Sequence, residues 1–274
     1  MDYLKKLLNL DNKVAVLTGG GGILAGEMAS GLLNAGVKVV LLDINETNLK
    51  NRINSLSESG NTITGHKCNI LDEKNITEVK KEILGEFKKI DILINAAGGN
   101  MPGATVGVDQ TIFDIKMDDF KKVTDLNLNG TVLPTLIFGK TMAEQKTGSI
   151  INISSMAAQR VLTRVVGYSA AKAAIDIFTK WMAVELSQKF GSGIRVNAIA
   201  PGFLLTDQNR TLLTNPDGSL TQRGHTIINM TPFKRFGQPE ELIGTVLWLA
   251  GDASKFVTGI VVPIDGGFSA FSGV

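Results

Sequence analysis

Short apolar runs alternate with longer amphipathic stretches along the 274 residues of the chain. The short runs fit strands covered on both faces, because such strands read as nearly continuous apolar sequence. The longer stretches carry apolar residues at the spacing of one helical face. The pattern predicts strands near residues 14–18, 37–42, 62–68, 91–95, 149–153, 194–199 and 260–264, and helices near residues 23–35, 46–58, 73–87, 118–146, 165–190 and 239–250.

This order of elements predicts an α/β fold of the Rossmann type, a doubly wound, seven-stranded parallel sheet with helices on both faces. The sequence contains no linker, repeat or low-complexity tract, so we expect one domain over residues 1–274. Residues 99–117 and 203–237 interrupt the alternation as long irregular segments. Both follow the carboxyl ends of predicted strands, where such folds bind ligands, and we interpret them as walls of a substrate pocket.

Composition and charge narrow the class of protein. Hydrophobic residues make up 43% of the chain and charged residues 20%, which is ordinary for a globular protein. The net charge of +2, with lysine and glutamate interleaved, gives no electrostatic reason to expect nucleic acid as a partner. No apolar run approaches the ~20 residues of a membrane span. The first residues lack the cleavage pattern of a signal peptide.

Cysteine and histidine are scarce. Cys68 is the only cysteine, which excludes an internal disulfide and fits a reducing cytoplasm. His66 and His225 are the only histidines, and their surroundings have no spacing typical of a metal site. We therefore expect a cytoplasmic protein without a metal ion, a membrane or a nucleic acid among its partners.

A glycine run near the N-terminus joins a predicted strand to a predicted helix. Residues 19–22 are all glycine, and the helical spacing begins at Ile23. Such a turn lets a pyrophosphate approach the backbone and the helix N-terminus, which supplies N–H groups and a positive dipole. The second strand ends at Asp43. A carboxylate there can accept both ribose hydroxyls of an adenosine and would repel a 2′-phosphate, so we predict NAD(H) in preference to NADP(H).

A tyrosine and a lysine suggest proton-transfer chemistry. Tyr168 and Lys172 are four residues apart in helix-forming sequence, so both project from one helical face. A free phenol has a pKa near ~10, and a neighbouring ammonium favours the phenolate by about 1.4 kcal/mol per pKa unit. Ser154 and Ser155 follow a predicted buried strand upstream. Taken alone, the pair also fits an exposed Tyr/Lys pair on a helix surface.

Together with Asn95-Ala-Ala-Gly98, Asn127 and Pro201-Gly202 before Thr206, these features make the chain resemble the short-chain dehydrogenase/reductase family from about residue 11 onward. The resemblance implies an NAD(P)-dependent oxidoreductase that interconverts a secondary alcohol and a ketone. It also implies a dinucleotide-binding catalytic domain and the catalytic residues Asn127, Ser155, Tyr168 and Lys172. Ser155 is chosen over Ser154 because it lies thirteen residues before the tyrosine, as in the family.

The resemblance also implies a role for each catalytic residue. Tyr168 would exchange a proton with the substrate oxygen, and Ser155 would orient that oxygen. Lys172 would bind the nicotinamide ribose and, with the cationic oxidised nicotinamide, lower the pKa of Tyr168. Asn127 would hold a water linking Lys172 to solvent. The expected cofactor contacts are Gly19, Gly22, Ile23, Leu24, Asp43, Asn69, Ile70, Asn95, Ala96, Ala97, Tyr168, Lys172, Pro201, Gly202 and Thr206.

The chain departs from the family pattern in two places. The phosphate loop of the family reads Thr-Gly-x-x-x-Gly-x-Gly, and an ungapped match puts Ile23 and Ala25 at the second and third glycines. Because Gly22 and Gly26 flank these positions, a loop shifted by one residue is the alternative. The family often has aspartate where this chain has Asn69, whose amide oxygen can still accept a hydrogen bond from the adenine amino group.

Several local strings resemble the D-mannonate oxidoreductase (fructuronate reductase) group of sugar-acid enzymes. They are Thr18-Gly-Gly-Gly-Gly22, Asn95-Ala-Ala-Gly-Gly-Asn100, Pro201-Gly-Phe-Leu-Leu-Thr-Asp-Gln-Asn-Arg210 and Asp265-Gly-Gly-Phe-Ser-Ala-Phe-Ser-Gly-Val274. A sugar acid needs a cation for its carboxylate, and arginine offers a bidentate fork. We expect this cation to be Arg160 first and Arg210 second, with Arg164 as the third candidate. Hydroxyl partners would be Asn100, Gln208 and Asn209.

Other substrates stay open. The same chemistry would serve a gluconate 5-dehydrogenase-like enzyme, another polyol dehydrogenase or a 3-oxoacyl thioester reductase. A non-catalytic dinucleotide sensor is a further alternative, although the chain keeps all four catalytic positions. The polar run Thr206-Asp-Gln-Asn-Arg-Thr211 favours a polyhydroxylated substrate.

The predicted helices 118–146 and 165–190 are more apolar than one buried stripe requires. Examples are Leu133, Leu136, Ile137, Phe138, Ile175, Ile177, Phe178 and Trp181. The family resemblance implies a dimer contact through these helices and a second contact through residues 239–250 and 260–264. We therefore expect a homotetramer with two-fold axes.

Overall fold

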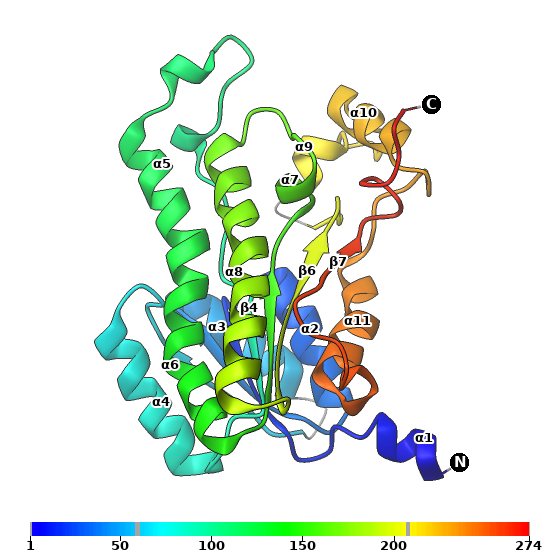
Figure 1. Cartoon of the computed structure of the whole chain (residues 1–274). Helices are drawn as coiled ribbons and strands as arrows, with labels where there is room; N and C mark the ends of the chain where they lie inside the picture. Colours follow the sequence, from blue (N-terminus) through cyan, green and yellow to red (C-terminus); the bar gives the residue numbers. More distant parts are fainter. Residues whose placement is uncertain (1, 58–60, 207–208, 274) are drawn as a thin grey trace.

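The computed structural model describes residues 2–57, 61–206 and 209–273. Seven parallel strands form one sheet in the order β3-β2-β1-β4-β5-β6-β7. Their bounds are β1 Val14–Thr18, β2 Lys38–Asp43, β3 Ile63–Lys67, β4 Ile92–Asn95, β5 Gly148–Ile153, β6 Ile194–Pro201 and β7 Val261–Ile264. Each strand lies within two residues of its predicted position. The predicted Rossmann-type, doubly wound sheet is confirmed (Figure 1).

Helices cover both faces of the sheet (Figure 1). Side chains of α4, α6 and α8 pack on one face, and side chains of α2, α3 and α11 pack on the other. The α-helical bounds are α1 Asp2–Leu7, α2 Ile23–Asn34, α3 Glu46–Ser57, α4 Glu73–Phe87, α5 Met117–Thr124, α6 Gly130–Gln145, α7 Met156–Gln159, α8 Val166–Phe190, α9 Arg210–Leu213, α10 Gln222–Met230 and α11 Ile243–Ala250. Shorter 3₁₀ turns are η1 Pro102–Ala104, η2 Ile112–Asp114, η4 Pro239–Leu242 and η5 Asp252–Ser254.

Strand β1 illustrates why the strands read as apolar runs. All its residues are buried, although successive side chains point to opposite faces. Ala15 and Leu17 join the core under α2 and α11, whereas Val16 joins the core under α4 and α6. Because both faces are covered, the strand needs an apolar residue at every position.

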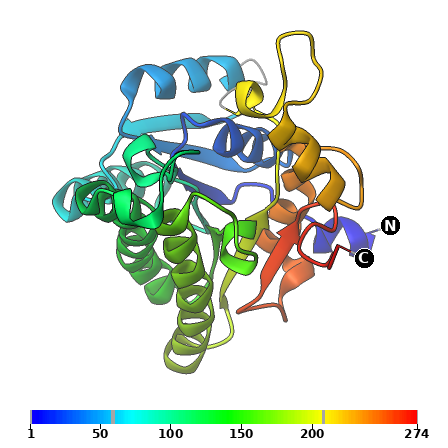
Figure 2. The same ribbon diagram turned by 90° about the horizontal axis from the view of Figure 1, so that it is seen from above.

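The carboxyl ends of the central strands are held together by buried polar side chains. Asn95 Nδ2 donates to Thr135 Oγ1 and to Asn152 Oδ1, both at 2.8 Å. Thr18 Oγ1 accepts from the amides of Ala96 and Ala97, both at 3.1 Å. The chain order reverses between β1 and β4, so this edge, seen from above in Figure 2, contains the crevice where doubly wound folds bind ligands.

Two predictions about the elements were wrong. The predicted helix 118–146 is two helices, α5 and α6, separated by a π-helical turn, η3 Asp125–Asn129. Such turns often occur at functional sites, and this one contains the fully buried Asn127. Residues 203–237 were expected to be irregular, but they include α9 and α10, and Thr221 caps α10 by accepting from the Gly224 amide at 3.1 Å.

Two features are absent from the described residues. In that part of the chain, no helix is long and apolar enough to cross a membrane. The same residues include no group of three or more histidine, cysteine, aspartate or glutamate side chains that could hold a metal ion.

Candidate active site

Lys172 lies at the centre of the site, on α8, one turn after Tyr168. Its side chain is only 3% exposed, which rules out the alternative of a solvated surface pair. Lys172 Nζ donates to the Ile153 carbonyl at 2.6 Å and lies 5.5 Å from the centre of the Tyr168 ring. The lysine therefore joins the end of β5 to the face of α8 that carries the tyrosine.

Burial lowers the pKa of Lys172 to about 8, and the carboxylate of Asp176 acts in the opposite direction. Asp176 lies one turn further along α8, and Ser154 Oγ donates a hydrogen bond to it. Burial raises the pKa of Asp176. Sequence analysis missed Asp176, although its spacing of four residues from Lys172 is the signal of an ion pair along a helix.

Ser155 differs from Ser154 in where its hydroxyl lies. It is the N-cap of α7, where its Oγ accepts from the Ala157 amide at 3.1 Å. It also makes a side-chain hydrogen bond that lowers the pKa of Tyr168. Since Ser154 is committed to Asp176, Ser155 is the serine whose hydroxyl reaches the tyrosine.

The pKa of Tyr168 is raised, because loss of hydration at the buried phenol outweighs the hydrogen bond with Ser155. The sequence predicted that Lys172 and oxidised nicotinamide would together lower this pKa. In the protein chain alone the direction is the opposite. Lys172 is itself shifted toward its neutral form, which weakens its support of a phenolate.

Asn127 fixes the chain after β4. Its Nδ2 donates to the carbonyls of Gly99 and Val123 at 2.7 and 2.8 Å, and its Oδ1 accepts from the Gly99 amide at 3.1 Å. A Cβ at Gly98 would lie 2.6 Å from Asn127 Oδ1 and 3.4 Å from Lys172 Nζ. Glycine at position 98 therefore lets the backbone pass between the asparagine and the lysine.

The glycine turn between β1 and α2 fits a pyrophosphate. Gly19 has φ +67°, and a Cβ there would lie 2.7 Å from Ala97 Cα. Gly22 is the N-cap of α2 and provides no side-chain cap. The first N–H groups of the helix, including those of Ile23 and Leu24, are therefore left for an anion. Gly22 directly precedes the helix, and Ile23 is its first residue.

Asp43 lies across the glycine turn at the end of β2. Its Oδ2 accepts from the Gly21 amide at 2.9 Å and its Oδ1 from the Asn45 amide at 2.8 Å. Each carboxylate oxygen keeps a second lone pair for a ribose hydroxyl. Further along the crevice, Asn69 is exposed and its Oδ1 accepts from the Leu71 amide at 3.1 Å, while Ile70 is buried.

The segment after β6 completes the crevice. The Gly202 amide donates to the Ile264 carbonyl at 2.9 Å, so Pro201 and Gly202 are held against β7. The Thr206 amide donates to Asn209 Oδ1 at 2.8 Å, and Asn209 Nδ2 donates to the Leu204 carbonyl at 2.8 Å. Asn209 therefore closes a turn within its own segment.

The predicted substrate residues are not brought to one pocket. Arg160 is exposed and donates to the carbonyl of Ser269, with Nε at 2.7 Å, and to that of Phe271. Arg164 Nε donates to the Val106 carbonyl at 2.7 Å. Asn100 Nδ2 donates to Thr105 Oγ1 at 2.7 Å. Arg210 is exposed on α9, and Gln208 lies outside the described residues.

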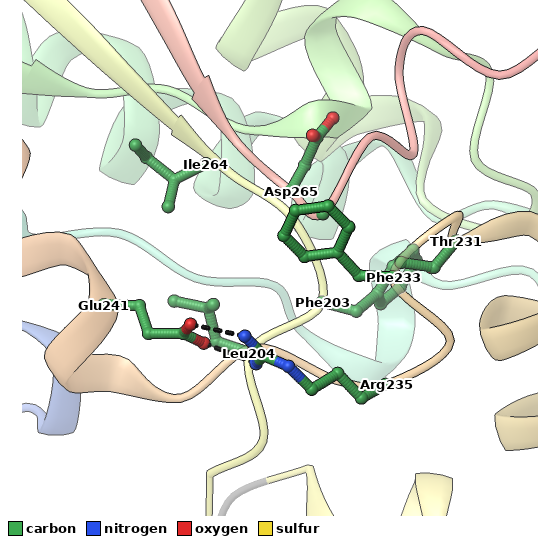
Figure 3. A pocket seen from close by; sticks show the side chains of 10 residues that line it. Phe203, Leu204, Thr231, Phe233, Arg235, Glu241, Ile264 and Asp265 are labelled. Carbon is green, nitrogen blue, oxygen red and sulfur yellow. Dashed lines mark hydrogen bonds and ion pairs between the residues drawn. The ribbon is translucent and has the colours of Figure 1, made fainter.

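Two pockets share Phe203 as a wall. The first is shown in Figure 3 and is closed on one side by Arg235 and Glu241, which pair at 2.7 and 2.6 Å. The second lies between α10 and the segment that joins α7 to α8, and its lining residues are Val161, Leu162, Thr163, Phe203, Gln222, Arg223, Thr226, Ile227, Met230 and Phe268. Arg223 is an arginine that sequence analysis missed.

Comparison with known proteins agrees with this geometry. Residues 22–269 match the family model described as Enoyl-(Acyl carrier protein) reductase. The uncharacterized oxidoreductase UxuB of Bacillus subtilis (strain 168) is 46% identical over 275 residues, which cover 97% of this chain and 98% of that protein. A 3-oxoacyl-(acyl-carrier-protein) reductase of Synechocystis sp. is 33% identical over 264 residues, which cover 96% of this chain and 99% of the relative.

Among solved structures, a proposed D-mannonate oxidoreductase from Haemophilus influenza with bound NAD has a TM-score of 0.91 and 43% sequence identity, and the match covers 97% of this chain and 98% of that one. The chain therefore belongs to the short-chain dehydrogenase/reductase family and is an NAD(P)-dependent oxidoreductase.

Proposed function

We propose that the protein interconverts a secondary alcohol and a ketone on a sugar acid of the D-mannonate/D-fructuronate type, with NAD(H) as its cofactor. The observation that carries the proposal is the buried Lys172 beside Tyr168, with the Ser155 hydroxyl on the same phenol. The relative named for D-mannonate oxidation supports the substrate class. The whole chain would act as one catalytic domain, with residues 99–117 and 203–237 as walls of the substrate pocket.

In the proposed mechanism the cofactor, when bound, takes up or supplies the hydride at the reacting carbon. In the oxidative direction the carbinol C–H bond gives up that hydride, the O–H proton passes to Tyr168, and the carbon–oxygen double bond forms. Ser155 hydrogen-bonds the substrate oxygen and orients it. In the reductive direction Tyr168 returns the proton to the new alkoxide.

Lys172 has two tasks in this mechanism. Its ammonium stabilises the phenolate form of Tyr168, which burial alone opposes. Among the residues that the structure describes, its Nζ donates to the Ile153 carbonyl alone, so donors remain for the nicotinamide ribose. Asn127 holds Gly99, which follows the Gly98 that lies against the lysine, and a water between Asn127 and Lys172 would connect the lysine to solvent.

The cofactor contacts follow from the crevice. Gly19 and Gly22 would line the pyrophosphate, the amides of Ile23 and Leu24 would donate to it, and Asp43 would hold the adenosine ribose. Asn69 and Ile70 would flank the adenine, and residues 95–97 would lie along the backbone of the cofactor. Pro201, Gly202 and Thr206 would cover the nicotinamide.

A 3-oxoacyl thioester reductase is the second candidate function. The Synechocystis relative of that name supports it, as do the apolar walls formed by Phe203 and Phe268, whose ring centres are 5.3 Å apart. The hydroxyl, amide and guanidinium groups of Thr163, Thr226, Gln222 and Arg223 in the same pocket favour the sugar acid. Gluconate 5-dehydrogenase-like and other polyol activities share that polar chemistry.

The protein would work in the cytoplasm as a homotetramer. Its only cysteine, Cys68, is a buried free thiol. Ile177, Trp181 and Val184 form one exposed stripe on α8, with 63, 60 and 56% of each residue accessible. Leu136 on α6 is also exposed. An apolar stripe of this kind is typical of an isologous contact between copies.

We predict that Tyr168→Phe lowers kcat by about 10²–10⁴-fold, because it removes the proton exchanger. The Kd for NADH should stay close to that of the wild type, since the glycine turn is untouched.

The assay is a panel of D-mannonate, D-gluconate, uncharged polyols and a 3-oxoacyl thioester with both cofactors. The proposal expects the highest kcat/KM for a sugar acid, and a thioester preferred over every sugar acid would contradict it. A kcat of Tyr168→Phe above a tenth of the wild-type value would contradict the role of Tyr168 as the proton exchanger.

Lys172→Met tests the burial of the ammonium. In the folded wild type the lysine releases its proton near pH 8, whereas in the unfolded chain it holds the proton up to about pH 10.4. Between these values the unfolded state binds more protons, so wild-type stability should rise with pH relative to the variant. Urea unfolding of the cofactor-free proteins from pH 7.5 to 9.5 should show a relative gain of about 2 kcal/mol. If the difference in unfolding free energy between the wild type and Lys172→Met does not change with pH, the lowered pKa of the buried lysine is contradicted.

Asp43 should set the cofactor preference. Wild-type kcat/KM should be higher with NADH than with NADPH, because a 2′-phosphate would meet the carboxylate. Asp43→Asn removes the charge and leaves one acceptor oxygen in place of the two that the Gly21 and Asn45 amides use, so it should reduce the ratio of kcat/KM with NADH to kcat/KM with NADPH. A wild-type preference for NADPH would overturn the assignment.

Light scattering at micromolar concentration should give the mass of a tetramer. Trp181→Glu should lower that mass, because it puts a charge into the proposed contact on α8. Leu8→Glu is the matched control, since Leu8 is also exposed but lies outside α6 and α8. A monomeric wild type would refute the assembly.

A further inference from the structure

The pocket beside α10 contains an arginine that the mechanism does not use. Arg223 is half-buried and lines this pocket together with Phe203, Phe268 and the 161–163 segment. The described lining residues include no aspartate or glutamate. Within the described part of the chain, no ion pair or hydrogen bond of the Arg223 guanidinium is found. A desolvated cation without an acidic partner is costly, and such a cation at a pocket wall favours an anionic ligand.

The charge of another arginine also acts on Arg223. Burial lowers the pKa of Arg223, and the positive charge of Arg164 lowers it further. Both effects favour the bound anion, because a negative charge placed near the two guanidinium groups relieves their repulsion and replaces lost hydration.

Arg164 is held in place on the other side. Its backbone has φ +79°, its carbonyl accepts from the Val106 amide at 2.9 Å, and its Nε donates to the Val106 carbonyl at 2.7 Å. These bonds fasten the segment before α8 to the 99–117 loop. Arg164 directly follows Thr163 of the pocket wall and lies four residues before Tyr168.

Helix α10 holds Arg223 from the opposite wall. Ile227, one turn after Arg223, packs with Leu213 and Phe236 in a small apolar core of its own. A Cβ at Gly224 would lie 2.2 Å from the Leu213 carbonyl, so α10 packs closely on α9. The arginine therefore projects from a supported helix.

We propose that Arg223, at the wall of this pocket, binds the carboxylate of the substrate. The inference rests on the proposed function, since it assigns the cation for the sugar acid. Arginine suits the task because its planar fork matches a carboxylate in two parallel hydrogen bonds. Arg160, expected first from the sequence, instead donates to the chain near the C-terminus.

The placement also restricts the substrate. Ser155, Tyr168 and Lys172 are not among the described residues that line the Arg223 pocket. The carboxylate is therefore bound away from the reacting carbon. The site selects acids whose carboxylate is several bonds from the carbinol, as at C5 of an aldonate, and disfavours 2-hydroxy acids that react beside their carboxylate.

The test compares Arg223→Ala, Arg223→Lys and the control His225→Ala, which changes an exposed residue of α10 that does not line the pocket. Arg223→Ala should raise KM for D-mannonate about ten- to a hundredfold, as expected for a charge-assisted hydrogen bond, and Arg223→Lys should restore part of it. The kcat/KM for an uncharged polyol and the Kd for NADH should not change. The His225→Ala variant should match the wild type throughout.

Calorimetric measurement of D-mannonate binding to the enzyme–NADH complex distinguishes failure of the Arg223 site from failure of the proposed function. If the wild type oxidises D-mannonate and Arg223→Ala binds D-mannonate as tightly as the wild type, the anion site is overturned and the proposed function stands. Equal losses for D-mannonate and the uncharged polyol would also overturn the site. Binding that Arg223→Ala abolishes supports the site even if turnover of D-mannonate is absent, in which case the proposed function fails alone.

Discussion

The site depends on keeping the Lys172 ammonium out of water. Strand β5 contacts it through the Ile153 carbonyl and the chain after β4 approaches it at Gly98, while the charge of Asp176 on α8 opposes the effect of its burial. The cost of desolvation is expressed as the lowered pKa of the lysine. An ammonium with few partners interacts strongly with whatever anion forms beside it, and here that anion would be the Tyr168 phenolate. The same burial that strains the lysine therefore prepares the proton transfer.

The sheet was predictable from sequence because each of its strands needs apolar side chains on both faces. A strand such as β1, covered on both faces, tolerates no polar interior position, so its apolar run is unambiguous. Tyr168, Lys172 and the glycine turn were predictable for a different reason. Their chemistry demands fixed spacing along one element, and spacing is what a sequence displays.

Features that depend on contacts between distant segments were not predictable. The π-helical turn at Asn127 has no local sequence signal, and it matters because the Asn127 amide reaches Gly99. The contacts of Arg160 were not predictable for the same reason. Arg160 is near Ser155 in sequence, but its guanidinium is occupied by carbonyls more than a hundred residues away. Arg223 is far from the catalytic motif in sequence and reaches the pocket only because α10 folds over it.

The two ends of the proposed substrate site differ in how they are built. The proton-transfer end is made from strand ends and a 25-residue helix, whose side chains are fixed by buried hydrogen bonds. The anion end is made from the shorter α9 and α10, which share a small core separate from the two large ones. Separate cores allow the acid-binding wall to vary while the proton-transfer geometry stays fixed. On the proposed assignment of Arg223, a change of substrate would require changes in α10 and the chain around it and would leave the residues around Tyr168 unchanged.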